Sequence, residues 1–210
     1  MPKSDRIRGF TLIELLIVVA IIAILAAIAV PNFLEAQIRS KVSRAKTDMR
    51  TIRVAMEAYR VENEAYPPDV YGAGDMGGPW RTWYVLTTPI AYLTRVPPSP
   101  FWYRDYVSGG HQYPGMPPYD YSQYDHPYTY RGEPEFRPHA LVCRSLGLFW
   151  TVTCSGPDEK NDMQWQNIAG LYLRGSSVYN DATAHRMLYD PTNGTVSDGD
   201  IILTNRGFPN

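Results

Sequence analysis

A long apolar run dominates the first thirty residues of the chain. Between Phe10 and Val30 the only ionisable side chain is Glu14, and sixteen apolar residues follow one another from Leu15. A helix of these 21 residues is about 31 Å long, which matches a hydrocarbon core of about 30 Å. The pattern therefore predicts a helix over residues 10–30 that spans a membrane.

Beyond Pro31 the apolar residues become periodic instead of continuous. Proline removes a backbone donor, so we expect a helix kink at Pro31, and Tyr66-Pro67-Pro68 should end the helix. Residues 31–66 are thus predicted to be an amphipathic continuation, which gives one helix of about 85 Å from residue 10 to residue 66. Its apolar row recurs every three or four residues, at Leu34, Ile38, Val42, Ala45, Met49, Ile52, Met56 and Tyr59.

The remaining segment, residues 67–210, is predicted to form a globular domain outside the membrane. A short helix is expected within Thr82–Leu93, broken or restarted at Pro89. Residues 103–139 are rich in tyrosine and proline and predict a long loop. We expect its tyrosine rings to pack on the sheet or on a neighbouring subunit while their hydroxyls stay in contact with water. Stacking of the rings on sugars is the alternative.

Two later segments have strand patterns. Aromatic and β-branched residues over 148–154 favour a strand, which an acidic turn follows. An Asn193-Gly194 turn precedes a short apolar strand near the C-terminus. We expect the sheet to be built mainly from segments after residue 128.

The charge pattern does not favour nucleic acid as the main partner. The formal net charge is −1, and the seven bases from Arg39 to Arg60 alternate with acids. Such alternation is typical of a solvated helix face.

Glu14 is unexpected in a disposable targeting segment. Residues 27–29 (Ala-Ile-Ala) have a small-x-small pattern, so an ordinary signal peptide cleaved after Ala29 is one alternative. However, a carboxylate inside an apolar span costs a few kcal/mol and usually marks a functional position. The bases before the span favour a cytoplasmic N-terminus, but five more over residues 31–50 leave the topology open on charge alone.

The residues around Glu14 carry a resemblance to a known family. Arg8-Gly9-Phe10-Thr11-Leu12-Ile13-Glu14, followed by an apolar helix, resembles the N-terminus of type IV pilins and type II secretion pseudopilins. The match includes a short basic leader, a glycine before the cut, an aromatic first residue and Glu at the fifth mature position. The resemblance implies that prepilin peptidase cuts between Gly9 and Phe10 on the cytoplasmic side and that the Phe10 amine is methylated. It also implies an α+β pilin fold, with the long helix packed on a small antiparallel sheet.

Cleavage provides an oppositely charged partner for Glu14. The new amine of Phe10 lies four residues before Glu14, and a buried charge is tolerated when it meets an opposite charge. The pair can form within one helix or between subunits; we favour the second, because an exposed intrahelical pair contributes only tenths of a kcal/mol. Small residues along the helix permit close packing of copies, namely Ala20, Ala23, Ala26, Ala27 and Ala29.

Two further segments resemble the major pseudopilin. Residues 87–101 resemble its segment between the helical loop and the sheet, although Ser99 stands where the family often has Asp. Ser155-Gly156-Pro157-Asp158 resembles the element that leads into its calcium loop, although Glu159 and Lys160 stand where glycines are usual. Ordinary turns are the alternative to calcium binding. The candidate Ca²⁺ ligands are Asp158, Asp162, Asp198 and Asp200.

The cysteines and histidines do not indicate an enzyme. Cys143 and Cys154 form a small, even set that is compatible with a disulfide in an exported chain, worth roughly 3 kcal/mol. The four histidines lack metal-ligand spacing, and no nucleophile or phosphate-binding motif is present.

The sequence therefore predicts a structural subunit of a type II secretion pseudopilus, held in the inner membrane with its N-terminus in the cytoplasm before assembly. Its expected partners are copies of itself, other pilins or pseudopilins, prepilin peptidase and the inner-membrane assembly platform. A type IV pilus subunit, major or minor, is the alternative within the class. A secreted carbohydrate-binding protein with an ordinary signal peptide is the alternative outside it. The predicted organisation is a leader over residues 1–9, a membrane and filament-core helix over 10–30, its amphipathic continuation over 31–66, and a globular domain over 67–210.

Overall fold

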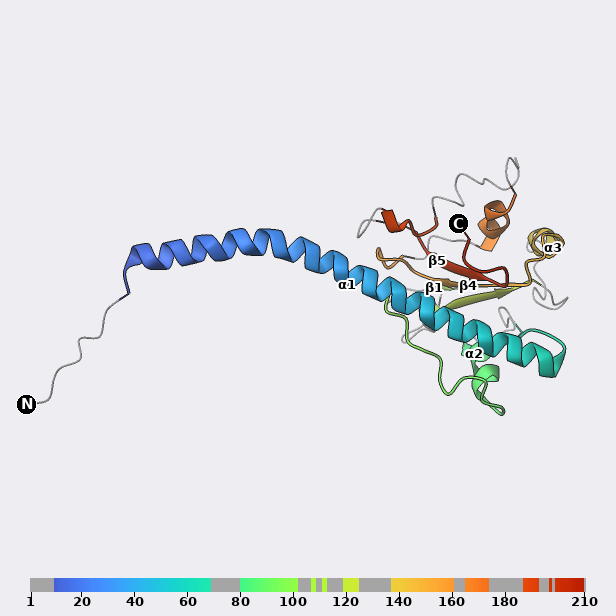
Figure 1. Cartoon of the computed structure of the whole chain (residues 1–210). Helices are drawn as coiled ribbons and strands as arrows, with labels where there is room; N and C mark the ends of the chain where they lie inside the picture. Colours follow the sequence, from blue (N-terminus) through green and yellow to red (C-terminus); the bar gives the residue numbers. More distant parts are fainter. Residues whose placement is uncertain are drawn as a thin grey trace, which may run out of the picture.

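The computed structural model shows a long helix that carries a small domain at its C-terminal end (Figure 1). It describes residues 10–68, 80–101, 107–108, 111–112, 119–124, 137–160, 165–173, 187–192, 197 and 199–209. The helices are α1 (Leu12–Asn63), α2 (Trp80–Thr87), α3 (Arg137–Ser145) and the 3₁₀ helix η1 (Trp165–Leu171). The strands are β1 (Val107–Ser108), β2 (His111–Gln112), β3 (Asp120–Gln123), β4 (Trp150–Cys154) and β5 (Ile201–Thr204).

Helix α1 is 52 residues long, or about 78 Å, and confirms the prediction of one long helix to within a few residues at each end. Pro31 lies inside the helix, and Figure 1 shows α1 as one continuous, gently curved helix. The helix ends at Asn63, and its C-cap residue Glu64 adopts the left-handed conformation with φ 56°. By length and composition α1 is able to cross a membrane, and none of its most apolar window is buried in the chain.

The second half of α1 packs on the domain through the predicted apolar row. Its buried residues are Val42, Ala45, Met49, Ile52, Ala55 and Met56. Ile38 and Tyr59 are half-buried against the same core, which confirms most of the row. Leu34 does not belong to the buried row, since it is 51% exposed. The domain covers α1 only from about residue 38 onward, so the predicted row is one helical turn too long.

A three-stranded antiparallel sheet in the order β3-β4-β5 faces α1. Thr153 of β4 pairs with Asp120 of β3 and with Ile202 of β5, so β4 is the central strand. Every residue of β4 and β5 is buried, because both faces of the sheet are covered. Alternate residues point to opposite faces. Thus Trp150 and Val152 join the core beneath α1, while Ile202 joins a second cluster.

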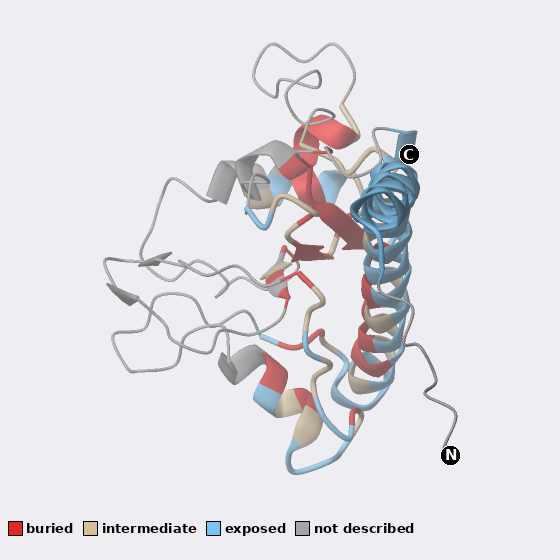
Figure 2. Cartoon of the chain, turned by 90° about the vertical axis from the view of Figure 1, so that its left-hand side faces the viewer, coloured by how far each residue is buried: buried red, intermediate tan, exposed pale blue. Residues whose placement is uncertain are grey.

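The second cluster lies on the sheet face away from α1. It is formed with residues of α3 and η1, among them Cys143, Ile168 and Ala169. Figure 2 shows the buried strands between α1 and the helices of this layer. The arrangement, a long helix on one face of a small antiparallel sheet, agrees with the α+β pilin fold.

The tyrosine-rich segment departs from the predicted loop. Strand β3 lies at residues 120–123, before the expected start of the sheet at 128, and the β1–β2 pair precedes it. Tyr119, Tyr121 and Tyr124 are buried, and their hydroxyls form hydrogen bonds with other atoms of the protein. Tyr121 donates to Pro67 O over 2.9 Å, for example. Packing on the sheet is therefore confirmed for these three tyrosines, and the prediction of wet hydroxyls is wrong for them.

The helix pattern after α1 was predicted only in part. Helix α2 confirms a short helix before Pro89, although it begins at Trp80 and ends at Thr87. Helix α3 was not predicted at all. The strand pattern over 148–154 and the closing apolar strand are confirmed as β4 and β5.

Candidate functional site

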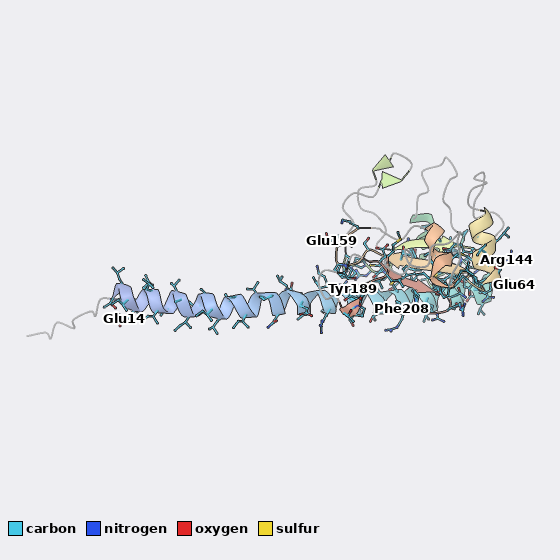
Figure 3. The ribbon with its side chains drawn as sticks, turned by 90° about the horizontal axis from the view of Figure 1, so that it is seen from above. Glu14, Glu64, Arg144, Glu159, Tyr189 and Phe208 are labelled. Atoms are coloured by element: carbon cyan, nitrogen blue, oxygen red, sulfur yellow. The ribbon has the colours of Figure 1, made fainter. Side chains whose placement is uncertain are left out.

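The first candidate site is the exposed apolar half of α1. Figure 3 shows Glu14 at the far end of this half, well away from the domain. The large apolar side chains from Phe10 to Leu34 are exposed by between 46% and 83%. This much apolar surface requires a lipid or protein partner, because monomeric soluble proteins rarely expose patches of more than a few hundred Å².

Glu14 takes part in a capping box at the start of α1. Thr11 is the N-cap residue, and its Oγ1 accepts a hydrogen bond from Glu14 N at 3.3 Å. In return Glu14 Oε2 accepts from Thr11 N at 2.9 Å and from Thr11 Oγ1 at 2.7 Å. The spacing Thr-x-x-Glu is the sequence signature of this motif. This capping box was not predicted, and Glu14 was assigned to assembly alone.

The capping box leaves part of the Glu14 carboxylate available. Among the described residues only Thr11 donates to Glu14, and only to Oε2. A carboxylate has about four acceptor positions, so Oε1 can still accept from an amine on another chain. Thr11 is extended, with ψ 150°, and α1 begins one residue later. Phe10, the predicted first residue of the mature chain, therefore lies before the helix. Gly9 and the leader lie outside the described residues.

The second candidate site lies where the turn after β4 meets the chain before β5. A Cβ on Gly156 would lie 2.0 Å from Gly199 O and 3.8 Å from Asp158 Oδ1. The acidic turn and the segment leading to Asp200 are therefore in direct contact. This brings two of the four predicted calcium ligands into one region, whereas Asp162 and Asp198 lie outside the described residues.

The chemistry of this region is compatible with a cation. Asp158 Oδ2 is buried and accepts no hydrogen bond from the described part of the chain, while Asp158 Oδ1 accepts from Lys160 N at 3.2 Å. Asp200 is 1% exposed, and its backbone bonds to Met187 and Tyr189. Within the described ranges no three His, Cys, Asp or Glu side chains form a metal cluster. A calcium ion here would need loop carbonyls or the two undescribed aspartates as well.

The predicted Cys143–Cys154 disulfide is absent from the structure. Both cysteines are free and buried, and they belong to different core clusters on opposite sides of the sheet. Burial raises the pKa of each thiol to about 12. Cys154 Sγ lies 3.2 Å from Ser99 Oγ. Both residues therefore act as core side chains, because a reactive cysteine needs an accessible thiolate.

Comparison with known proteins gives matches at the N-terminus and along half of the chain. The family described as "Prokaryotic N-terminal methylation motif" matches residues 4–30. The type IV major pilin protein PilA of Myxococcus xanthus is 57% identical over 63 residues, which cover 30% of this chain and 29% of that protein. The type II secretion system core protein G of Escherichia coli is 30% identical over 114 residues, which cover 51% of this chain and 74% of that protein.

The extent of these alignments differs from one relative to the next. The core protein G of Pseudomonas aeruginosa is 44% identical over 64 residues and covers 45% of that protein. The chain thus spans less than a third of PilA but about three quarters of the Escherichia coli protein. No solved structure matches the chain.

Proposed function

The chain belongs to the type II secretion core protein G family of pseudopilins, and from this premise we propose that it is a structural subunit of a type II secretion pseudopilus. The observation that carries the proposal is the apolar first half of α1, which projects from the domain with none of its span buried. One chain cannot cover this surface. Lipid covers it before assembly, and copies of the same helix cover it in the filament.

Processing by prepilin peptidase is part of the proposal. The match to the N-terminal methylation motif over residues 4–30 supports it. Residues 1–9 face the cytoplasm, the cut falls between Gly9 and Phe10, and an inner-membrane platform extracts the processed subunit. N-terminal sequencing of the mature protein tests this step. A methylated Phe10 is the expected result, and a Val30 terminus would support the secreted carbohydrate-binding alternative instead.

Glu14 has two consecutive roles in this scheme. In the single chain its Oε2 caps α1 through Thr11. In the filament its carboxylate receives the Phe10 amine of an adjacent copy, which fixes the axial register of the helices. A charge in an apolar layer is tolerated only with such a partner.

The register role predicts a specific assembly defect. Glu14→Ala is expected to insert and to be processed, but to enter filaments poorly beside wild-type copies. The matched control is Glu35→Ala, since Glu35 lies beyond the apolar span and pairs with Arg39 at 2.5 Å on an exposed face. Electron microscopy and sedimentation of sheared filaments measure the difference. Normal filament numbers for Glu14→Ala would contradict the register role.

A type IV pilus is the second candidate, favoured by the 57% identity to PilA. That similarity covers 63 residues, whereas the similarity to the Escherichia coli core protein G covers 114 residues and so extends beyond α1. We therefore give the pseudopilus precedence. Deletion of the gene distinguishes the two, because loss of protein secretion indicates a pseudopilus and loss of surface filaments indicates a pilus.

Calcium binding at the turn after β4 remains a separate proposal. It is supported by the buried Asp158 Oδ2 and by the contact between residues 156 and 199. When bound, Ca²⁺ would neutralise the carboxylates and tie the turn to the chain before β5.

Thermal unfolding with and without calcium tests this site. At a concentration 100 times its dissociation constant, calcium would stabilise the domain by about 2.7 kcal/mol. The rise in Tm should disappear in Asp158→Asn and persist in Glu159→Gln, which removes an exposed charge from the same turn. An unchanged wild-type Tm in millimolar calcium would remove the metal from the proposal.

A further inference from the structure

One flank of the second half of α1 is basic. Because a helix turns about 100° per residue, positions 46, 50, 53 and 60 lie on one side of it. All four are Lys or Arg, and they extend over about 21 Å of the helix. The flank borders the buried row that begins at Val42, so it lies at the edge of the domain, and its side chains are exposed or half-buried. We call it the basic flank, and it consists of Lys46, Arg50, Arg53 and Arg60.

Aromatic rings of the same chain hold these cations in place. Arg50 Cζ lies 5.4 Å and Lys46 Nζ 5.6 Å from the ring centroid of Phe208. Arg60 Cζ lies 4.7 Å from the ring centroid of Tyr66, and Arg60 also donates to the Tyr66 hydroxyl at 3.0 Å. An arginine has five N–H donors, and stacking on a ring uses none of them. The basic flank therefore presents guanidinium groups that are already ordered, which lowers the entropy lost when a carboxylate binds.

The basic flank forms no ion pair with the described part of the chain. The salt bridges of α1 belong to two other cations, Arg39 and Arg44. Glu57 is the acid on the flank, and its carboxylate oxygens accept from the buried hydroxyl of Tyr66 at 3.2 Å instead. Four positive charges thus lie beside one carboxylate that already has a partner.

The opposite charge is concentrated at one end of the domain. Residues 157–162 and 189–200 together contain six acids and one base. Figure 3 shows Glu159 and Tyr189, one from each segment, at the end of the domain that lies closer to Glu14. Glu159 is exposed, and its carboxylate forms no hydrogen bond or ion pair with the described residues. We call these two segments the acidic end.

The two charged surfaces are displaced from each other along α1 within one chain. Glu64, four residues after Arg60, lies at the opposite end of the domain from Glu159 (Figure 3). The basic flank thus extends away from the acidic end of its own chain. A second copy that is displaced toward the C-terminal end of α1 would bring its acidic end to the level of residues 46–60. The charges of the two surfaces are then complementary.

We propose that the basic flank of one copy binds the acidic end of another copy of the chain. This inference rests on the proposed filament and names two charged surfaces that meet in it. Ordered arginines that face exposed carboxylates form charge-assisted hydrogen bonds, which also fix the relative orientation of the two domains.

Charge reversal tests the proposal in the full-length chain. We expect Arg50→Glu and Glu159→Arg each to reduce sheared, sedimentable filaments about fivefold or more, because each places like charges opposite one another at every repeat. The double variant should recover to within about twofold of wild type, since it restores the pair with the charges exchanged. Such recovery reports the contact itself, because two independent folding defects would add.

Arg44→Glu is the matched control, because Arg44 is an exposed cation on the opposite side of α1. It should assemble within about twofold of wild type. All three positions are exposed, so the Tm in detergent should stay within about 2 °C for every variant. Normal filaments from both single variants, or no recovery in the double variant, would overturn the proposal.

Disulfide crosslinking identifies the partner. Both native cysteines are buried, so introduced cysteines react selectively with a mild oxidant. Arg50→Cys and Glu159→Cys, carried by two differently tagged copies in the same cells, should give a heterodimer in isolated filaments. Arg44→Cys in place of Arg50→Cys should give none. Absence of the heterodimer, or a crosslink of position 50 to a different protein, would overturn the assignment to a second copy.

Glu14→Ala separates this inference from the proposed function. If Glu14→Ala loses filaments while Arg50→Glu and Glu159→Arg keep them, this inference fails and the proposed function stands. If wild-type cells form no filament of any kind, both fail.

Discussion

The structure predicts a large loss of stability when Gly156 is replaced by alanine. Gly156 follows β4, and a Cβ there would lie 2.0 Å from Gly199 O and 3.0 Å from Gly199 C. Both neighbours are backbone atoms, so no side chain can rotate away. Gly199 cannot retreat either, because its own Cβ position is 2.2 Å from the carbonyl carbon and oxygen of Leu188. The three segments that meet here therefore have no free space for a methyl group.

The cost of Gly156→Ala follows from this geometry. Favourable contacts between carbon atoms lie at about 3.5–4.0 Å, so the two segments must separate by more than 1 Å. Overpacking a tight core costs about 1–3 kcal/mol, and the upper value applies because only backbone can yield. At about 2–4 °C per kcal/mol for a chain of this size, the Tm should fall by about 6–12 °C.

Thermal unfolding of the full-length chain in detergent, followed by circular dichroism, measures the effect. Gly147→Ala is the matched control, since a Cβ at Gly147 meets nothing within 4 Å and only its left-handed φ of +71° is unfavourable. That conformation costs about 1–2 kcal/mol for a residue with a side chain. If Gly156→Ala lowers the Tm no more than Gly147→Ala, the close contact between the segments is wrong.

Three further predictions concern the core, the end of α1 and alkaline pH. Met49→Ala should cost about 2–5 kcal/mol in chemical denaturation, because Met49 is fully buried beneath the sheet. Glu64→Gly should raise the free energy of unfolding by about 1 kcal/mol, because Glu64 ends α1 at φ 56°, which suits glycine. Burial raises the pKa of Cys143 and Cys154 from 9.0 to about 12, so the thiols ionise first in the unfolded chain. Stability should fall as pH rises from about 9 toward 12, and Cys143→Ala with Cys154→Ala should weaken that fall in Tm measured across this range.

Much of the fold was predictable where the signal is local. The apolar run and the three-four periodicity gave α1 and most of its buried face, since both depend only on residues near in sequence. Strands β4 and β5 followed from their composition. The tyrosine-rich segment could not be predicted in this way, because its contacts are with residues far away in sequence. The hydroxyl of the buried Tyr119, for example, donates to Asp48 Oδ2 at 3.3 Å, and Asp48 lies 71 residues earlier.

The candidate sites show the same division. The motif around Glu14 is contiguous, so its resemblance to the pilin family could be recognised from the sequence. The capping box could also have been predicted, from the spacing of Thr11 and Glu14. The free cysteines were not predictable, because Cys143 and Cys154 are close in sequence but lie in clusters on opposite sides of the sheet.

The sequence alone determined that this protein has a membrane-length apolar helix, a pilin-type processing motif and an amphipathic continuation of that helix. Only the tertiary structure decided where the domain stops covering α1, which tyrosines are buried and which residues of the helix stay exposed. Periodicity and motifs are carried by neighbouring residues along the chain. Burial is decided by contacts between residues far apart in sequence, such as Arg53 with Asn205, 152 residues later.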